Sequence, residues 1–131
     1  MTVTVAGGIG ISRLGQIQIR AHDLERAAAF YENVLGLKLL FKAPPGLAFF
    51  DCGGVRLMLD RPAKPEFDHA SSILYFAVPD IQAAHARMKE SGVKFEDDPH
   101  MIARMPDHDL WMTFFRDSED NLLALMSEVK R

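Results

Sequence analysis

The densest run of reactive side chains surrounds His108, which stands between Asp107 and Asp109, with His100 and Arg104 a few positions before it. A neighbouring carboxylate raises the basicity of an imidazole, so His108 is a candidate general base for proton transfer. His100 is the second candidate, and its even spacing from Arg104 predicts that the two side chains share one strand face. Because Asp-His-Asp after a proline is also ordinary polar turn composition, a purely structural role is the alternative.

A second set of polar side chains alternates with isoleucines near the start of the chain. Gln16, Gln18 and Arg20 are separated by Ile17 and Ile19. In a strand this alternation places the three polar side chains on one face, while a helix covers the isoleucines. The forked donors of Arg20 suit a carboxylate or a phosphate. The alternative is that Arg20 pairs with a surface acid near the end of the strand.

The elements that must position these side chains occur twice along the chain. Asp23 and Asp80 are suited to cap helices, because a carboxylate accepts hydrogen bonds from the free amides of the first turn. Gly36 and Gly92 supply the left-handed stops, and apolar residues recur at helical spacing in between. Strands are predicted at residues 16–20, 38–42, 47–52, 55–60, 73–78, 93–96 and 122–126, with 111–116 joining them.

These elements predict an α+β fold of two βαβββ modules, whose cup-shaped sheets surround a shared cavity. The first module covers residues 12–60 and the second covers residues 72–128. A linker at residues 61–71, with prolines and charges, joins them, and residues 1–11 are predicted to be a flexible N-terminal tail. The whole chain is interpreted as one domain.

Composition excludes several classes of partner. The net charge is -3, and the basic residues are scattered along the chain, so nucleic acid is not an expected partner. Cys52 is the single cysteine, which excludes an intrachain disulfide and favours a reducing cytoplasm. The apolar stretch at residues 3–11 lacks a basic region before it, and no apolar segment reaches the roughly 20 residues of a membrane span.

The doubled βαβββ pattern carries a family resemblance. Its first copy contains Asp-Leu-Glu-Arg-Ala at residues 23–27, Phe-Tyr at 30–31 and Leu-Gly-Leu at 35–37. In these features residues 12–128 resemble the vicinal oxygen chelate (VOC) superfamily, which holds glyoxalase I, bleomycin resistance proteins, fosfomycin resistance proteins, methylmalonyl-CoA epimerase and extradiol dioxygenases. The turn at 116–122 resembles the family's Asp-Pro-x-Gly-Asn turn, without its proline and glycine.

The resemblance also implies where a metal ion would lie. In the metal-dependent members, the first and fourth strands of each module contribute one ligand each. These positions fall here on Gln16, Met58, Ile73 and Ala124. Two of these side chains have no donor atom, and a thioether is a soft ligand. We therefore expect that the family metal site is lost and that no cofactor binds. The alternative is a divalent metal held by unorthodox ligands such as Gln16, His100 and His108.

The predicted cavity is lined mainly by apolar side chains with a few polar ones, which suits a small organic ligand. The side chains expected to contact this ligand are Gln16, Gln18, Arg20, Met58, Tyr75, Arg104, Trp111 and Met126. Because Arg20 and Arg104 are basic, an anionic or aromatic metabolite fits better than a large cation such as bleomycin.

Three function classes follow from this reading. The first is a metal-free small-molecule binding protein of the bleomycin-resistance kind. The second is an enzyme of the lyase, isomerase or dioxygenase type, which would use an unorthodox metal site or a histidine base at His100 or His108. The third is a structural or partner-binding module. A homodimer is expected, and the sheets can pair within one chain or across the dimer.

Overall fold

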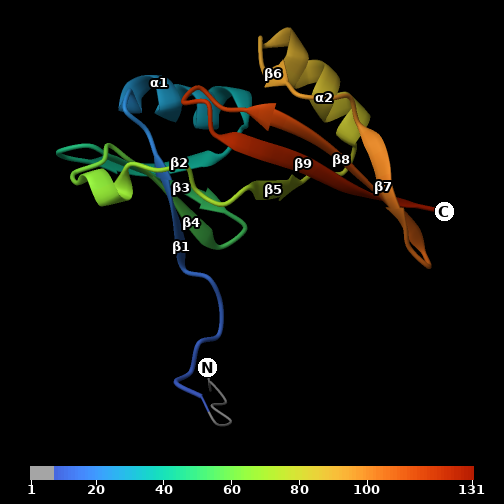
Figure 1. The fold of residues 1–131 in the computed structure, drawn as a ribbon, viewed down its shortest axis with the longest axis horizontal. Coiled ribbons are helices and arrows are strands. Elements are labelled where there is room, and N and C mark those ends of the chain that lie inside the picture. Colours follow the sequence, from blue (N-terminus) through green and yellow to red (C-terminus); the bar gives the residue numbers. More distant parts are fainter. Residues whose placement is uncertain (1–7) are drawn as a thin grey trace.

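A computed structural model describes residues 8–131, which form two modules with a helix over each sheet (Figure 1). The predicted tail at residues 1–11 falls largely on residues 1–7, which lie outside the described part. The first module consists of β1 (Gln16–Arg20), α1 (Leu24–Ala29), a π-helical turn (Phe30–Val34), β2 (Lys38–Ala43), β3 (Leu47–Cys52) and β4 (Val55–Asp60). Its sheet has the order β1-β4-β3-β2, and β1 runs parallel to β4.

The second module repeats this topology. It consists of β5 (Leu74–Ala77), α2 (Ile81–Glu90), β6 (Lys94–Phe95), β7 (His100–Arg104), β8 (His108–Arg116) and β9 (Leu122–Lys130). The sheet order is β5-β9-β8-β6, and β7 also pairs with β8. A 3-10 turn (Pro65–Phe67) lies in the linker between the modules. The predicted α+β fold of two sheets that form a cup is confirmed.

One edge strand of the second module differs from the prediction. Both β6 and β7 pair with β8, at opposite ends of it, so together they take the place that β2 has in the first module. The interruption contains Asp97, whose carboxylate accepts hydrogen bonds from Thr113 Oγ1 at 2.8 Å and Phe114 N at 2.9 Å. A side chain thus replaces the missing backbone partner, close to Pro99, which has no N–H to offer.

Both helices begin at the predicted caps. Asp23 accepts from Arg26 N, and Asp80 accepts from Ala83 N, at 3.1 Å each. The first helix was expected to continue regularly up to Gly36, but it changes to a π-helical turn after Ala29. In that turn Tyr31 is fully buried and reaches the second module.

The apolar core lies between the helices and the sheets. It includes Ile19, Phe50 and Leu59 from the first module, and Phe115 and Leu125 from the second, in one continuous cluster. Burial of these side chains is the main stabilising contribution to the fold. In Figure 1 both helices lie on the upper side of the sheets, which leaves the other side of each sheet without a helix.

We call these uncovered sides the first and second open faces. Alternation along the strands places the following side chains on the first open face: Gln16, Gln18, Arg20, Phe41, Phe49, Arg56, Met58 and Asp60. The second open face carries Tyr75, His100, His108, Met112, Phe114, Ala124 and Met126. The candidate site residues lie mostly on these faces.

The turn between β8 and β9 holds the two modules together. Glu119 accepts hydrogen bonds from His22 N at 2.6 Å and Asp23 N at 3.1 Å, and pairs with Arg26 at 3.1 Å. Tyr31 Oη donates to Asp117 Oδ2 at 2.7 Å. The contact between the modules is therefore made by side chains, and no strand of one sheet pairs with the other sheet within residues 8–131.

No helix in the described part of the chain is long and apolar enough to cross a membrane.

Candidate functional site

A row of hydrogen-bonded polar side chains lines β1 and β4 on the first open face. Arg56 Nε donates to Gln16 Oε1 at 3.1 Å, and Gln16 Nε2 contacts Met58 Sδ at 3.6 Å. Further along the strands, Gln18 Nε2 donates to Asp60 Oδ2 at 3.0 Å. The predicted ligand-binding residues Gln16, Gln18 and Met58 are thus brought together, with Arg56 and Asp60 added by the structure.

Arg20 pairs with an acidic side chain, which was the alternative to a role as a ligand anchor. Its guanidinium lies 3.5 Å from Asp68 in the linker, and the same carboxylate oxygen lies 2.7 Å from His22 Nε2. Arg20 is therefore already paired, which makes it a poorer anchor for a ligand than its position on the strand suggested.

Two stacked phenylalanines form an aromatic surface next to the polar row. The ring centroids of Phe41 and Phe49 lie 4.6 Å apart, at an interplanar angle of 28°. Arg56 lies over Phe49, with its guanidinium carbon 5.4 Å from the ring centroid. Phe49 is buried, whereas Phe41 is 48% exposed. This surface offers a flat ring for stacking and a cation beside it.

The sequence contains a signal for part of this surface. The same alternation that placed Gln16 and Gln18 on one face also places Arg56 and Asp60 with Met58 on β4. Phe41 had no such signal, because it reaches the open face only through a shift of register in β2.

Asp60 is a partly buried titratable group on the first open face. Partial burial raises the pKa of its carboxyl above the ordinary value. Its partner Gln18 is an amide and brings no charge to offset this effect.

The second open face is dominated by aromatic and thioether groups. Tyr75 and Phe114 meet edge to face, with centroids 5.8 Å apart. Ala124 pairs with both of them across the strands and is fully buried. Met126, another predicted contact, pairs with Met112 on β8. Tyr75 is 45% exposed, so this face also presents a ring to its surroundings.

The two histidine candidates lie on this face but have separate partners. His108 Nδ1 lies 2.7 Å from Asp107, and its Nε2 lies 3.8 Å from Glu128. His100 Nδ1 lies 2.9 Å from the Asp98 carbonyl oxygen. The hydrogen bond to His108 lowers the pKa of Asp107, so this carboxylate keeps its charge beside the imidazole. A histidine held by carboxylates can act in proton transfer.

The prediction that His100 and Arg104 share a strand face is wrong. His100 pairs with Met112 and Arg104 pairs with Asp109, and these partners are an odd number of residues apart on β8. The cause is a shift of register between Met101 and Ala103, which rotates the following residues to the other face. Arg104 lies 3.7 Å from Asp109, on the helix side.

Trp111 also lies away from the predicted cavity. It packs against the apolar core on the side of α2 and lines a pocket of about 500 Å³ with Pro79, Ile81 and Val129. Alternation along β8 explains this, because Trp111 and the buried Phe115 are an even number of positions apart and so lie on the same face of the sheet. Trp111 therefore lies on the opposite face of the sheet from Met126, and its predicted contact with a ligand stays a prediction.

The four positions of the family metal site do not provide a set of donors for a hard cation. Gln16 Oε1 accepts from Arg56, and Met58 offers a soft sulfur atom. Ile73 lies just before β5 and is 40% exposed, while Ala124 is buried; neither has a donor. Within residues 8–131, no group of three or more His, Cys, Asp or Glu side chains is placed to hold a metal ion.

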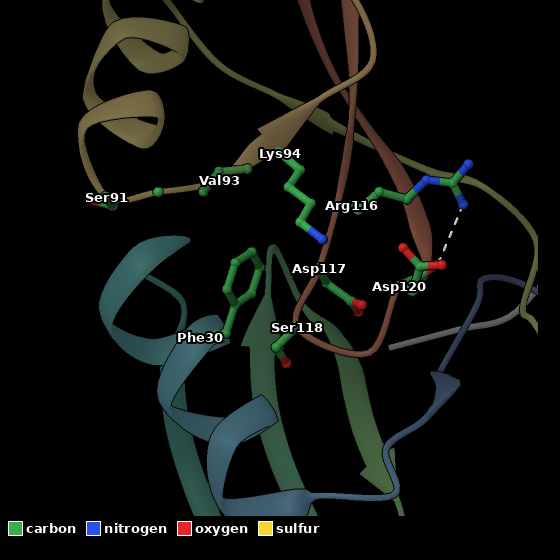
Figure 2. Close-up of a pocket in the computed structure, with 9 residues that line it drawn as sticks. Phe30, Ser91, Val93, Lys94, Arg116, Asp117, Ser118 and Asp120 are labelled. Carbon is green, nitrogen blue, oxygen red and sulfur yellow. Dashed lines mark hydrogen bonds between the residues drawn. The ribbon is translucent and has the colours of Figure 1, made fainter.

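A separate pocket of about 430 Å³ lies where the modules meet (Figure 2). Phe30 comes from the first module, and Lys94, Arg116, Asp117 and Asp120 come from the second. Figure 2 shows Lys94 extending into the space above Asp117. Because the two cationic side chains face two acidic ones, the walls of this pocket do not favour a ligand of one charge.

Comparison with known proteins places these features in a family context. The sequence model of the family described as Glyoxalase/Bleomycin resistance protein/Dioxygenase superfamily matches residues 13–125. The protein YraH of Bacillus subtilis (strain 168) is 26% identical over 129 residues, which cover 86% of this chain and 96% of that protein.

Solved structures share the fold. Lactoylglutathione lyase from Agrobacterium tumefaciens is 24% identical with a TM-score of 0.70, and the match covers 88% of this chain and 93% of that chain. TnmS3, an antibiotic binding protein from Streptomyces sp. CB03234, is 23% identical with a TM-score of 0.72, covering 92% of this chain and 98% of that chain. A superfamily member from Sphaerobacter thermophilus DSM 20745 is 24% identical with a TM-score of 0.75, covering 90% and 98%.

Proposed function

Because the chain belongs to the Glyoxalase/Bleomycin resistance protein/Dioxygenase superfamily, we propose that it binds a small anionic or aromatic metabolite on its open faces, without a metal ion. The observation that carries this proposal is the stacked pair of Phe41 and Phe49, in which Phe41 leaves about half of its surface exposed. Exposed aromatic surface of this kind is typical of binding sites. The antibiotic-binding relative TnmS3 supports the same class of function.

The chemistry of the family metal positions supports binding without a metal. Of the four side chains, Ile73 and Ala124 have no donor, and the Gln16 oxygen is already used by Arg56. Tyr75 and Phe114 lie on either side of Ala124, so aromatic carbon surrounds the position where the family would place a metal ligand.

We further propose that the functional unit is a homodimer. The strands β1 and β5 lie at free edges of their sheets, and both open faces expose aromatic rings, Phe41 at 48% and Tyr75 at 45%. Unpaired edges and exposed apolar side chains are features that a second copy covers. Light scattering coupled to size exclusion should give about twice the 14.7 kDa mass of one chain. A monomer at micromolar concentration would contradict the dimer.

The binding proposal is tested by thermal melts with a panel of small aromatic acids, amides and phenols, with and without a chelator. Aromatic compounds should raise the melting temperature, and the chelator should leave both the melt and the shift unchanged. Phe41→Ala removes the exposed ring and should abolish most of the shift, whereas Phe67→Ala, in the linker, is the matched control. A melt raised by manganese, nickel, zinc or iron(II) would overturn the metal-free proposal.

A second candidate function is catalysis with His108 as a general base. The 2.7 Å contact between His108 Nδ1 and Asp107 favours it, because the carboxylate fixes the orientation of the imidazole ring. His108→Ala should then abolish turnover of any compound that the wild-type protein converts. Unchanged turnover in this variant would remove His108 from the mechanism.

A further inference from the structure

Arg56 is held on the first open face in a way that leaves four of its five side-chain N–H donors free. Its Nε donates to Gln16 Oε1 at 3.1 Å, and its guanidinium lies over the ring of Phe49. Its two terminal Nη groups have no partner among residues 8–131, and it forms no ion pair there. The nearest acid in the register is Asp51 on β3, but the Asp51 carboxylate accepts from Gly54 N in the hairpin turn.

Five of the other arginines form ion pairs, whereas Arg13, Arg61 and Arg87 form none among residues 8–131. Ion pairs engage Arg20 with Asp68, Arg26 with Glu119, Arg104 with Asp109, Arg116 with Glu96 and Arg131 with Asp109. Arg56 differs from these five arginines, because the only polar partner of its side chain among residues 8–131 is the neutral amide of Gln16. Its positive charge is therefore not balanced by a contact on the open face.

The fixed orientation of Arg56 favours one kind of ligand group. With Nε occupied and one face of the guanidinium against Phe49, the end that carries both Nη groups is the free one. Two parallel N–H donors match the two oxygens of a carboxylate. Because Gln16 and Phe49 already restrict the side chain, less conformational entropy is lost when a ligand binds.

The aromatic neighbours define the rest of the ligand. Phe49 lies between Arg56 on one side and Phe41 on the other, so the cation and the exposed ring are separated by a single phenyl group. A ligand that contacts both must carry its anionic group at a short distance from an aromatic ring. Asp60 accepts a hydrogen bond from Gln18 and lies four positions after Arg56 on β4, beyond the direct reach of a carboxylate bound at Arg56.

We propose that Arg56 selects a monoanionic aromatic acid, whose carboxylate binds the two Nη groups while its ring lies against the exposed Phe41. This inference rests on the proposed binding function and narrows it, by naming both the ligand class and the residue that sets the charge preference. Arg20, the anchor expected from the sequence, is replaced in this role because Asp68 already neutralises it.

The experiment compares 3-phenylpropanoate with 3-phenylpropanamide by isothermal titration calorimetry. The two probes share the ring and the chain and differ only in the charge of the end group. The wild-type protein should bind the acid about tenfold or more tightly than the amide, and added salt should weaken only the acid. Arg56→Met should lose this preference while it keeps the affinity for the amide.

Two further variants keep the test decisive. Arg56→Lys retains the charge but not the fork, so it should bind the acid with intermediate affinity. Arg87→Met, on α2 and outside the open faces, should behave as the wild type. Because Arg56 is exposed, these variants should fold; if Arg56→Met does not, Arg56→Lys carries the comparison.

Each outcome separates this inference from the broader proposal. If the wild-type protein binds acid and amide equally, or if Arg56→Met keeps the preference for the acid, Arg56 does not select the ligand although aromatic binding stands. If neither probe binds the wild-type protein, the aromatic binding function itself fails for this ligand class, and the inference fails with it.

Discussion

At the scale of single residues, two arginines on the same face have different roles because of their neighbours. Arg20 lies at the end of β1, where the linker brings Asp68 within 3.5 Å. Arg56 lies near the start of β4, against Gln16 and Phe49, which orient it without neutralising it. A guanidinium is always charged in proteins, so the availability of a carboxylate decides which of the two is free for a ligand.

Asp60 gives a prediction at this scale. Because burial raises the pKa of its carboxyl in the folded protein, the folded state binds a proton more readily than the unfolded state. Stability should therefore fall as the pH rises from about 4, the ordinary aspartate value, through the raised pKa. Asp60→Asn removes this contribution and can still accept from Gln18.

The difference between Asp60→Asn and the wild type isolates this effect from other titrating groups. Urea unfolding at several pH values should show the variant gaining stability relative to the wild type as the pH rises towards 7. Glu66→Gln, at an exposed carboxylate in the linker that forms no ion pair among residues 8–131, serves as the control. A constant difference across the pH range would contradict the role given to Asp60.

At the scale of elements, register shifts in the edge strands β2 and β7 determine which side chains lie on the open faces. The register of β2 shifts between Leu39 and Phe41, and that of β7 shifts between Met101 and Ala103. Without the first shift, Phe41 would lie on the same face of the sheet as Leu39, which is the face that the helix covers. The bulge instead places it opposite Phe49, where the two rings stack.

The turn of the hairpin between β3 and β4 is predicted to depend on its glycines for stability. Gly53 and Gly54 have φ values of 59° and 88°, a conformation that residues with a Cβ adopt only with strain. Gly54→Ala should lower the free energy of unfolding by about 1–2 kcal/mol. The cause is strain alone, because nothing lies within 4 Å of a Cβ at this position.

Chemical denaturation measures this cost, with Gly15→Ala as the matched control. Gly15 also has open space around a Cβ and no positive φ, so its substitution should change stability little. Equal effects of the two substitutions would show that the turn does not require the left-handed conformation.

At the scale of the whole molecule, the two modules share one apolar core, and a few polar contacts at the start of α1 also join them. Glu119 uses both carboxylate oxygens for backbone donors at the start of α1, and its side chain is only 6% exposed. Next to it, Tyr31 donates to Asp117, and burial is the main reason that the pKa of Tyr31 is raised well above its usual value. These contacts fix the relative position of the two open faces.

Glu119→Gln tests this connection. An amide has only one acceptor oxygen, so its NH₂ group would face a backbone N–H of His22 or Asp23, and the charge opposite Arg26 is lost. The free energy of unfolding should fall by about 1–3 kcal/mol. Thermal and urea unfolding measure it, with Glu90→Gln at the end of α2 as the control. An effect no larger than that of the control would mean that Glu119 does not hold the modules together.

The sequence by itself determined the doubled α+β topology, the positions of most strands, both helix caps and the side chains of β1 that share a face. These follow from alternation, helical spacing and capping, which act between residues close in the chain. The tertiary structure decided which side chains join them. Phe41 and Arg104 take their faces from strand register, and Arg20 takes its partner from the linker. Register and ion pairing depend on segments that are distant in sequence, so local patterns cannot specify them.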